Sequence, residues 1–310
     1  MSLETDLLID RRRLKRRLLF WRVAAVLAVL ACALALVGRA GGLTVGGAHV
    51  ARLNVSGIIT DQRKLNEAVA GLADDASVKA LMVEINSPGG SVAGGEALHD
   101  AIAHVAAKKP VVAVMGGTAA SAGFMIAMPA ARIFARDSTL TGSIGVILET
   151  GEASGLLGKL GITAEAITSG PLKDQPSFTR PLTDQGREVL HGLVMDMYDQ
   201  FVGMVADGRH MDPARVRELG DGRAYTGRQA LQLGLIDAIG GETEARAWLA
   251  SERHVPASLP VRDVTTGGLT ARAFGGSADG LLGTMLKTVL SQGLSIDGAW
   301  AVWQPSSQGD

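Results

Sequence analysis

Three glycine-rich segments of this 310-residue chain carry groups that could do covalent chemistry. Ser121 lies in the small-residue run 116–123, and Lys173 lies in the Pro/Gly turn 169–174. A serine hydroxyl becomes a nucleophile when a neighbouring base takes its proton, and a neutral lysine can be that base. The third segment, 86–91, has a Pro-Gly-Gly sequence that frees backbone N–H groups to bind a developing oxyanion. Each segment alone is better explained as a helix N-cap, a solvated lysine or a tight turn.

A lysine must be neutral to act as a base, which sets a physical requirement on the site. A lysine with its ordinary pKa of about 10.4 is neutral in roughly one molecule in 2,500 at pH 7. Burial among apolar walls must therefore lower that pKa to about 7, at a cost of about 4 kcal/mol. The carboxylate of Asp174 would oppose this if it pointed inward. We therefore expect Asp174 to point away from Lys173 or to pair elsewhere, with Arg180 one candidate partner.

Alternating strands and helices must position these segments. Strands separated by helices of 10–15 residues predict right-handed crossovers and a largely parallel sheet. Each of the three segments follows an expected strand, so all three should lie at the carboxyl edge of the sheet. The hydrophobic pattern predicts strands at 50–59, 78–85, 111–115, 133–135, 144–147 and 162–168, and helices at 65–72, 92–107, 121–128 and 182–209, the last with Thr183 as its cap.

Five segments in this order resemble the signal peptide peptidase A (SppA) family of membrane-anchored serine proteases, in its short, single-repeat form. The matching text is N-S-P-G-G-S at 86–91, A-A-S-A-G at 119–123, T-G-S-I-G-V at 141–146, S-G-x-x-K-D at 169–174 and G-R-A-Y-T-G-R-Q-A-L-Q-L-G-L-I-D at 222–237. The resemblance covers about residues 48–241. It implies an α/β fold of the crotonase and Clp-protease (ClpP) superfamily, a spiral of repeated ββα units around a largely parallel sheet.

The resemblance also implies a role for each matching residue. Ser121 corresponds to the nucleophile and Lys173 to the general base, while Ser143 corresponds to the serine that hydrogen-bonds the lysine and orients it. The backbone N–H groups of Gly89 and Ala122 correspond to the oxyanion hole. The family commonly has glycine after the nucleophile, so Ala122 is a departure that requires a negative φ at this position.

Other polar residues near these segments fit structural roles better. The six histidines contain no H-x-x-x-H pair, and Cys32 alone can form neither a disulfide framework nor a thiolate cluster. We expect no metal, and the chemistry requires no cofactor. The residues assigned structural or surface roles are Glu84, Asn86, Glu96, His99, His104 and Asp237.

Charge and hydropathy predict a membrane anchor at the N-terminus. The chain has 30 basic and 31 acidic residues and is 47% hydrophobic, which excludes disorder. Residues 1–22 hold seven basic and three acidic residues, followed by an uncharged run to Val37. A helix over 18–37 would span about 30 Å, one bilayer core. The bases at 11–17 would stay cytoplasmic, placing 40–310 outside. A signal peptide cleaved after Ala35 and a buried core helix are the alternatives.

The expected organisation has five parts. These are a cytoplasmic basic segment (1–17), a transmembrane signal-anchor helix (18–37), a linker (38–47), a Ser/Lys protease domain (48–254) and a variable, Gly/Ser-rich C-terminal tail (255–310) with a helix at 281–290. The protein would be a single-pass protein of the inner (cytoplasmic) membrane, with its catalytic domain on the periplasmic side.

The favoured function is an endopeptidase that degrades residual signal peptides and other hydrophobic segments. We expect the apolar run Phe124, Met125, Ile126 and Met128 to line its substrate pocket. The resemblance implies a homo-oligomeric ring or dome in which Lys173 can come from a neighbouring subunit, and no nucleic-acid partner is expected. The alternatives are an acyl-CoA hydratase or isomerase, which would need a carboxylate at the site, and a non-catalytic membrane scaffold.

Overall fold

The computed structural model describes residues 21–29, 47–265 and 300–302, in a chain that divides into two compact units, 1–47 and 48–310. In the first unit residues 21–29 are helical, whereas the rest of the expected anchor, 18–20 and 30–37, lies outside the described residues. Among the described residues, no helix has the length and hydropathy needed to cross a bilayer.

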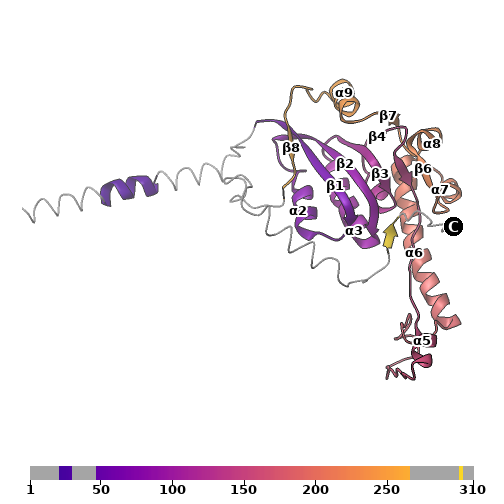
Figure 1. Cartoon of the computed structure of the whole chain (residues 1–310). Helices are drawn as coiled ribbons and strands as arrows, with labels where there is room; N and C mark the ends of the chain where they lie inside the picture. The colour runs from indigo at the N-terminus through magenta and orange to yellow at the C-terminus, as the bar shows by residue number, and fades with distance from the viewer. Residues whose placement is uncertain (1–20, 30–46, 266–299, 303–310) are drawn as a thin grey trace, which may run out of the picture. The chain divides into compact units, whose positions relative to one another are not determined.

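The second unit is built on a sheet whose central strands are parallel, as predicted (Figure 1). At its centre β2 pairs with β1 on one side and with β3 on the other, both in parallel. Strands β4 and β5 also pair parallel to β3, and β8 pairs parallel to β1. Only β6, on β5, and β9, on β2, are antiparallel among the described pairs. The strands are β1 (His49–Ile59), β2 (Val78–Ser91), β3 (Val111–Ala120), β4 (Arg132–Ala135), β5 (Leu140–Gly142), β6 (Ala224–Thr226), β7 (Ala238–Ile239), β8 (Val261–Asp263) and β9 (Trp300–Val302).

Helices cover both faces of this sheet. Successive residues of a strand point to opposite faces, and in the central strands the side chains on both faces are apolar. In β2, Val83 and Ile85 belong to a large core with α3 and the end of α6, whereas Met82 belongs to a smaller core with Leu249 of α9. The helices are α2 (Arg63–Gly71), α3 (Val92–Ala106), α4 (Ala122–Met125), α5 (Ser154–Lys159), α6 (Asp184–Arg209), α7 (Pro213–Leu219), α8 (Gly227–Gln232) and α9 (Glu242–Arg253). Buried apolar strands flanked by helices are the arrangement expected of a parallel sheet.

The long helix α6 confirms its predicted start. Thr183 is the N-cap, and its side chain accepts a hydrogen bond from the Gly186 N–H at 3.0 Å. The helix buries Phe201 and Val205 near its C-terminal end, whereas Leu193, closer to its start, remains 51% exposed. The second half of α6 is therefore part of the core, and the first half is not.

The predicted end of β2 at Ile85 is wrong. The strand continues to Ser91, because Gly89 and Gly90 pair with Ile58 and Ile59 of β1. The register shifts between Ser56 and Ile58, so that the step containing Pro88, which lacks an N–H, falls in a bulge. The Pro-Gly-Gly segment is therefore extended, not a tight turn.

Two other predicted strands are also wrong. Residues 162–168 form no strand and are exposed throughout, with Ile167 97% exposed, because no described strand lies alongside to pair with them. Residues 144–147 do not form a strand either, since β5 ends at Gly142 and the backbone turns at Ser143, where φ is 47°. The helix expected at 281–290 lies outside the described residues.

Candidate active site

Ser121 lies at a sharp turn between β3 and α4. Its φ is 56° and its ψ is −120°, a left-handed backbone that non-glycine residues rarely adopt. Two features hold it there. The Ser121 N–H donates to the Gly142 carbonyl at 2.8 Å, and the Ser121 carbonyl accepts from the N–H groups of Phe124 and Met125, each at 2.9 Å. Strain of this kind costs about 1–3 kcal/mol and typically marks a functional position.

The hydroxyl of Ser121 is buried and has no hydrogen-bond partner among the described residues. The side chain is only 1% exposed, so water does not fully replace the missing partner. A buried unpaired hydroxyl costs about 1–3 kcal/mol. Strain and an unsatisfied hydroxyl at the same residue are both unfavourable for folding, which makes Ser121 a candidate for chemistry and not for structural capping.

Ala122 meets the requirement set by the sequence. The left-handed conformation falls on Ser121, and Ala122 is not among the described residues with positive φ, so the predicted negative φ is confirmed. Ala122 is the first residue of α4, where an N–H has no acceptor within the helix. Its N–H is therefore available beside the serine.

Gly89 has a φ of 119°, which strongly favours glycine. Its N–H donates to the Ser87 hydroxyl at 3.1 Å, and that hydroxyl donates to the Gly57 carbonyl at 2.6 Å. The Gly89 N–H is thus already engaged, and service in an oxyanion hole requires it to exchange Ser87 for a substrate oxygen. Gly90 cannot be larger, because a Cβ there would lie 1.8 Å from the Ile59 carbonyl oxygen.

The elements that carry Gly89 and Ser121 are in direct contact. Ser87 of β2 pairs with Ala119 of β3, two residues before Ser121, so the end of β2 lies next to the serine. Gly123 fits against the Ser87 carbonyl, from which a Cβ would be 2.9 Å away. Small residues along 119–123 therefore allow the start of α4 to lie against the end of β2, as an oxyanion hole requires.

Ser143 directly follows Gly142, the residue whose carbonyl accepts the Ser121 N–H. It is buried, its φ is 47°, and its N–H donates to the Arg223 carbonyl at 3.0 Å. The structure therefore brings Ser143 close to Ser121 along the backbone, although no described hydrogen bond joins Ser143 to Lys173.

Lys173 lies elsewhere, in the segment between β5 and α6. Its side chain is exposed, and its backbone N–H donates to the Gly170 carbonyl at 3.1 Å. Because the Ser121 hydroxyl has no described partner, it has no hydrogen bond to Lys173 within this chain. Figure 1 shows α5 and its flanking segment beside the N-terminal end of α6, outside the sheet. The chain alone does not assemble the predicted dyad.

Asp174 pairs with Arg180 through a carboxylate oxygen and a guanidinium nitrogen. This confirms the expectation that the carboxylate next to Lys173 finds a partner elsewhere, and that Arg180 is that partner. A carboxylate paired in this way opposes deprotonation of a neighbouring lysine less than a free carboxylate would.

The expected apolar pocket is wrong. Phe124, Met125, Ile126 and Met128 are each at most 2% exposed and belong to the large core. They pack α4 beneath the sheet and against α6, where Gly208 leaves no room for a Cβ beside the Met128 backbone. Their hydrophobicity therefore serves folding and does not line a substrate site.

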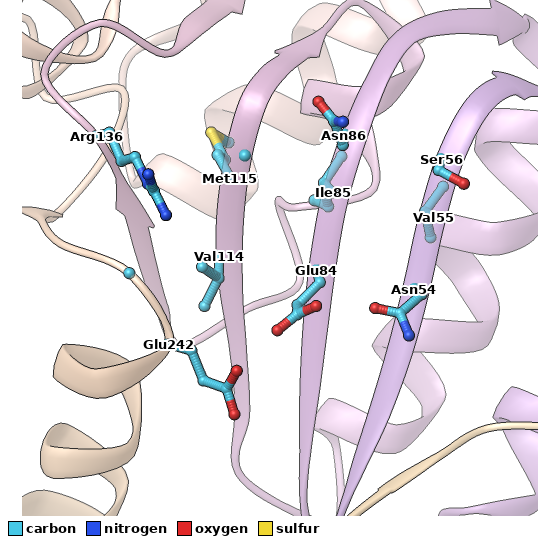
Figure 2. A pocket seen from close by; sticks show the side chains of 12 residues that line it. Asn54, Val55, Ser56, Glu84, Ile85, Asn86, Val114, Met115, Arg136 and Glu242 are labelled. Carbon is cyan, nitrogen blue, oxygen red and sulfur yellow. The ribbon is translucent and has the colours of Figure 1, made fainter.

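A cavity of about 300 Å³ that the sequence did not predict lies over the middle of β1, β2 and β3 (Figure 2). Burial raises the pKa of Glu84 in its wall, even though Arg52 lies 3.9 Å from that carboxylate. Asn86 also lines it and has the structural role assigned above, since its side-chain oxygen accepts the Thr118 N–H at 3.2 Å. The lining residues are Asn54, Val55, Ser56, Glu84, Ile85, Asn86, Val114, Met115, Gly116, Arg136, Gly241 and Glu242, and they do not include Ser121.

Asp237 has the structural role expected of it. Its carboxylate accepts two hydrogen bonds from Arg209 of α6, at 2.7 and 3.0 Å, and one from the Ile133 N–H at 2.8 Å. Burial alone would raise the pKa of Asp237, but the Arg209 hydrogen bonds and charge outweigh it and lower the pKa. Within the described part of the chain, no group of three His, Cys, Asp or Glu residues could hold a metal ion.

Comparison with known proteins agrees with this geometry. The model of Peptidase family S49 matches residues 103–256, which include Ser121, Ser143 and Lys173. A relative from Synechocystis sp., named "Putative protease slr0021", is 41% identical over 203 residues, covering 65% of this chain and 73% of the relative. The chain belongs to Peptidase family S49, a family of serine proteases.

Two further relatives extend the comparison. The "Putative signal peptide peptidase SppA" of Enterococcus faecium is 36% identical, over 66% of this chain and 64% of the relative. The "Putative protease MJ0651" of Methanocaldococcus jannaschii is 37% identical, over 61% of this chain and 62% of the relative. The S49 chain thus spans somewhat less than two thirds of these two relatives.

Proposed function

We propose that this S49 protein is a membrane-anchored endopeptidase that degrades residual signal peptides and other hydrophobic peptide segments. The observation that carries the proposal is the buried, unpaired hydroxyl of Ser121 on a strained turn at the end of β3. The name of the Enterococcus faecium relative, a signal peptide peptidase, supports the substrate class.

The chemistry follows from a serine and a lysine. Neutral Lys173 takes the proton of the Ser121 hydroxyl as its oxygen bonds to the scissile carbonyl carbon. The carbonyl oxygen becomes an oxyanion and accepts hydrogen bonds from the N–H groups of Ala122 and Gly89. The C–N bond then breaks, and the lysine gives its proton to the leaving amine. Water attacks the acyl-enzyme in the same way, giving its proton to Lys173 and releasing Ser121.

The lysine in this proposal comes from a second copy of the chain, in a homo-oligomeric ring or dome. Three observations support it. The Ser121 hydroxyl has no partner among the described residues of its own chain, Lys173 is exposed, and the segment around the lysine exposes large apolar side chains. These are Leu156 (60% exposed), Ile162 (51%), Ile167 (97%) and Phe178 (66%). Packing against a neighbour would bury this surface and desolvate the lysine, which favours its neutral form.

The proposed location is the inner membrane. The uncharged run ending at Val37, preceded by seven basic residues, supports an anchor over 18–37 with the N-terminus in the cytoplasm and the catalytic domain on the periplasmic side. Hydrophobic segments left in the bilayer would then lie near the site. Alkaline extraction of membranes from cells expressing the full chain tests this, and release of intact protein would refute the anchor.

Mixing two inactive variants tests the dyad and its assembly together. Ser121→Ala supplies chains with a lysine only, and Lys173→Ala supplies chains with a serine only. If the dyad forms between chains, co-assembled variants should regain hydrolysis and labelling by a serine-directed fluorophosphonate, while each variant alone stays inactive. Full labelling of Lys173→Ala alone would exclude Lys173 as the base. If neither the mixture nor the wild type hydrolyses peptides, the proposed peptidase activity is wrong.

A further inference from the structure

The hydroxyl of Ser87 links β1 to the candidate oxyanion hole at the end of β2. Ser87 is fully buried, and its oxygen accepts the Gly89 N–H at 3.1 Å. Its own proton can go to the Gly57 carbonyl at 2.6 Å or, over a longer distance, to the Gly89 carbonyl at 3.2 Å. Because the bond to Gly57 is much the shorter, the proton is directed to β1, and the oxygen is left to accept from Gly89.

Ser87 is held in place from three sides, whereas the Gly89 N–H can reorient. Besides its hydrogen bond to β1, Ser87 pairs with Ala119 of β3, and its carbonyl lies against Gly123 of α4. The peptide group between Pro88 and Gly89 has a glycine on one side, and glycine tolerates many backbone conformations. If the hydrogen bond between Ser87 and Gly89 opens, it is therefore Gly89 that moves.

We infer that Ser87 is a positioning residue that holds the Gly89 N–H away from the substrate until the oxyanion forms. The inference rests on the proposed function. A hydrogen bond to a charged oxygen is roughly twice as strong as one to a neutral oxygen. The N–H therefore gains by leaving the Ser87 hydroxyl for an oxyanion, but not for the neutral carbonyl of the bound substrate. In this way the hydroxyl keeps the hole from binding the uncleaved peptide bond, and the contribution of Gly89 is made only in the transition state.

Ser87→Ala in the full chain tests this role. Without the hydroxyl, the Gly89 N–H is free to bind the carbonyl of the uncleaved substrate as well as the oxyanion. KM for a hydrophobic peptide should therefore fall about fivefold, the size of one net neutral hydrogen bond, with kcat unchanged. The melting temperature should fall at the same time, because the Gly57 carbonyl loses its donor. A KM that stays the same or rises would overturn the inference, and so would a large fall in kcat, which would mean that Ser87 itself donates to the oxyanion.

Thr139→Val is the matched control, because the Thr139 hydroxyl makes the same two kinds of hydrogen bond with other partners. It is buried, donates to the Gly116 carbonyl at 2.7 Å and accepts the Arg136 N–H at 3.0 Å. Its removal should lower the melting temperature, as Ser87→Ala does, and leave KM at the wild-type value. A KM that falls equally in both variants would show that general loosening of the sheet is the cause, and would contradict a specific role for Ser87.

A covalent adduct of the wild-type chain measures the exchange without any change at Ser87. The Ser121 oxygen bonds to the phosphorus of a fluorophosphonate as fluoride leaves and Lys173 takes the hydroxyl proton, which places a phosphonyl oxygen where the oxyanion forms. In a crystal structure of the adduct, the Gly89 nitrogen should lie about 2.7–3.1 Å from that oxygen and more than about 3.5 Å from the Ser87 hydroxyl. A labelled Ser121 with the Gly89 N–H still bonded to Ser87 would refute the inference and leave the proposed function standing. Failure of Ser121 to react would instead refute the proposed function, on which the inference rests.

Discussion

The end of β3 and the segment between β5 and α6 carry the two candidate catalytic side chains in opposite surroundings. Ser121 is buried, its backbone is fixed by β5 and α4, and its hydroxyl has no hydrogen-bond partner in the part of the chain that the structure describes. Lys173 is exposed, in a segment that shows apolar side chains to solvent. The comparison shows that the described residues of one chain fix the surroundings of the nucleophile but leave the proposed base exposed, and in the proposed assembly a second chain would supply the surroundings of the base.

The largest expected effect is on kcat, and substitutions of the two candidate catalytic residues should lower it by similar factors. Ser121→Ala and Lys173→Ala should each lower kcat by about 10⁴-fold or more, because members of a nucleophile–base pair do not act additively. Neither change should lower the melting temperature, since one removes an unsatisfied hydroxyl and the other an exposed side chain. Peptide hydrolysis and thermal unfolding of the purified variants measure both. Retained turnover in either variant would break the assignment of that residue.

Replacing a glycine by alanine should change the unfolding free energy by different amounts in the two regions. Gly90→Ala puts a Cβ against the Ile59 carbonyl and should destabilise the domain by about 3 kcal/mol or more. Gly170→Ala meets nothing within 4 Å and should change stability by less than about 0.5 kcal/mol. Denaturant unfolding of both variants makes the comparison. A neutral Gly90→Ala would show that the end of β2 is less tightly packed than described.

Ion pairs in the two regions should respond differently to acid. The lowered pKa of Asp237 means that its pairing with Arg209 contributes stability above the ordinary pKa of about 3.9 and loses it as pH falls below that value. Asp237→Asn should therefore cost about 2 kcal/mol at pH 7 and less at pH 3, because the contribution declines progressively from about pH 3.9 down through the lowered pKa. Asp174→Asn, in the half-exposed pair with Arg180, should cost less than about 1 kcal/mol at pH 7. Unfolding at the two pH values compares the pairs, and a pH-independent cost for Asp237→Asn would contradict the linkage.

The smallest expected effect on folding concerns the exposed segment. Ile167→Ser with Phe178→Ser removes two exposed apolar side chains and should change the unfolding free energy by less than about 1 kcal/mol. The same change should shift the protein towards smaller assemblies in sedimentation experiments, since this surface is proposed to pack against a neighbour. Lys108→Ser, at an exposed position on the catalytic unit, is the control. Unchanged assembly would argue that the segment is not the interface.

The parts that the sequence predicted well are those fixed by local patterns. The capped start of α6 and the strand-to-helix position of Ser121 both follow from residue types over a few positions. The left-handed φ of Ser121 could not be predicted, because Gly142 of another strand imposes it. Residues 162–168 looked like a strand from composition, but a strand forms only beside a partner. The proposed partner of Lys173 on a second chain could not be read from the sequence, and the extension of β2 through Pro88 depends on a bulge in β2 opposite Gly57 of β1.

The support of Ser121 by Gly142 has a consequence for the order of synthesis. Gly142 pairs with Ala224 of β6, and the ring of Tyr225 packs against it, leaving no room there for a Cβ. The turn that presents the serine is therefore buttressed by a segment that leaves the ribosome long after the serine itself. A nascent chain that ends before β6 therefore contains the serine without the residues that support its turn, and we expect the turn to form only after most of the domain has been synthesised.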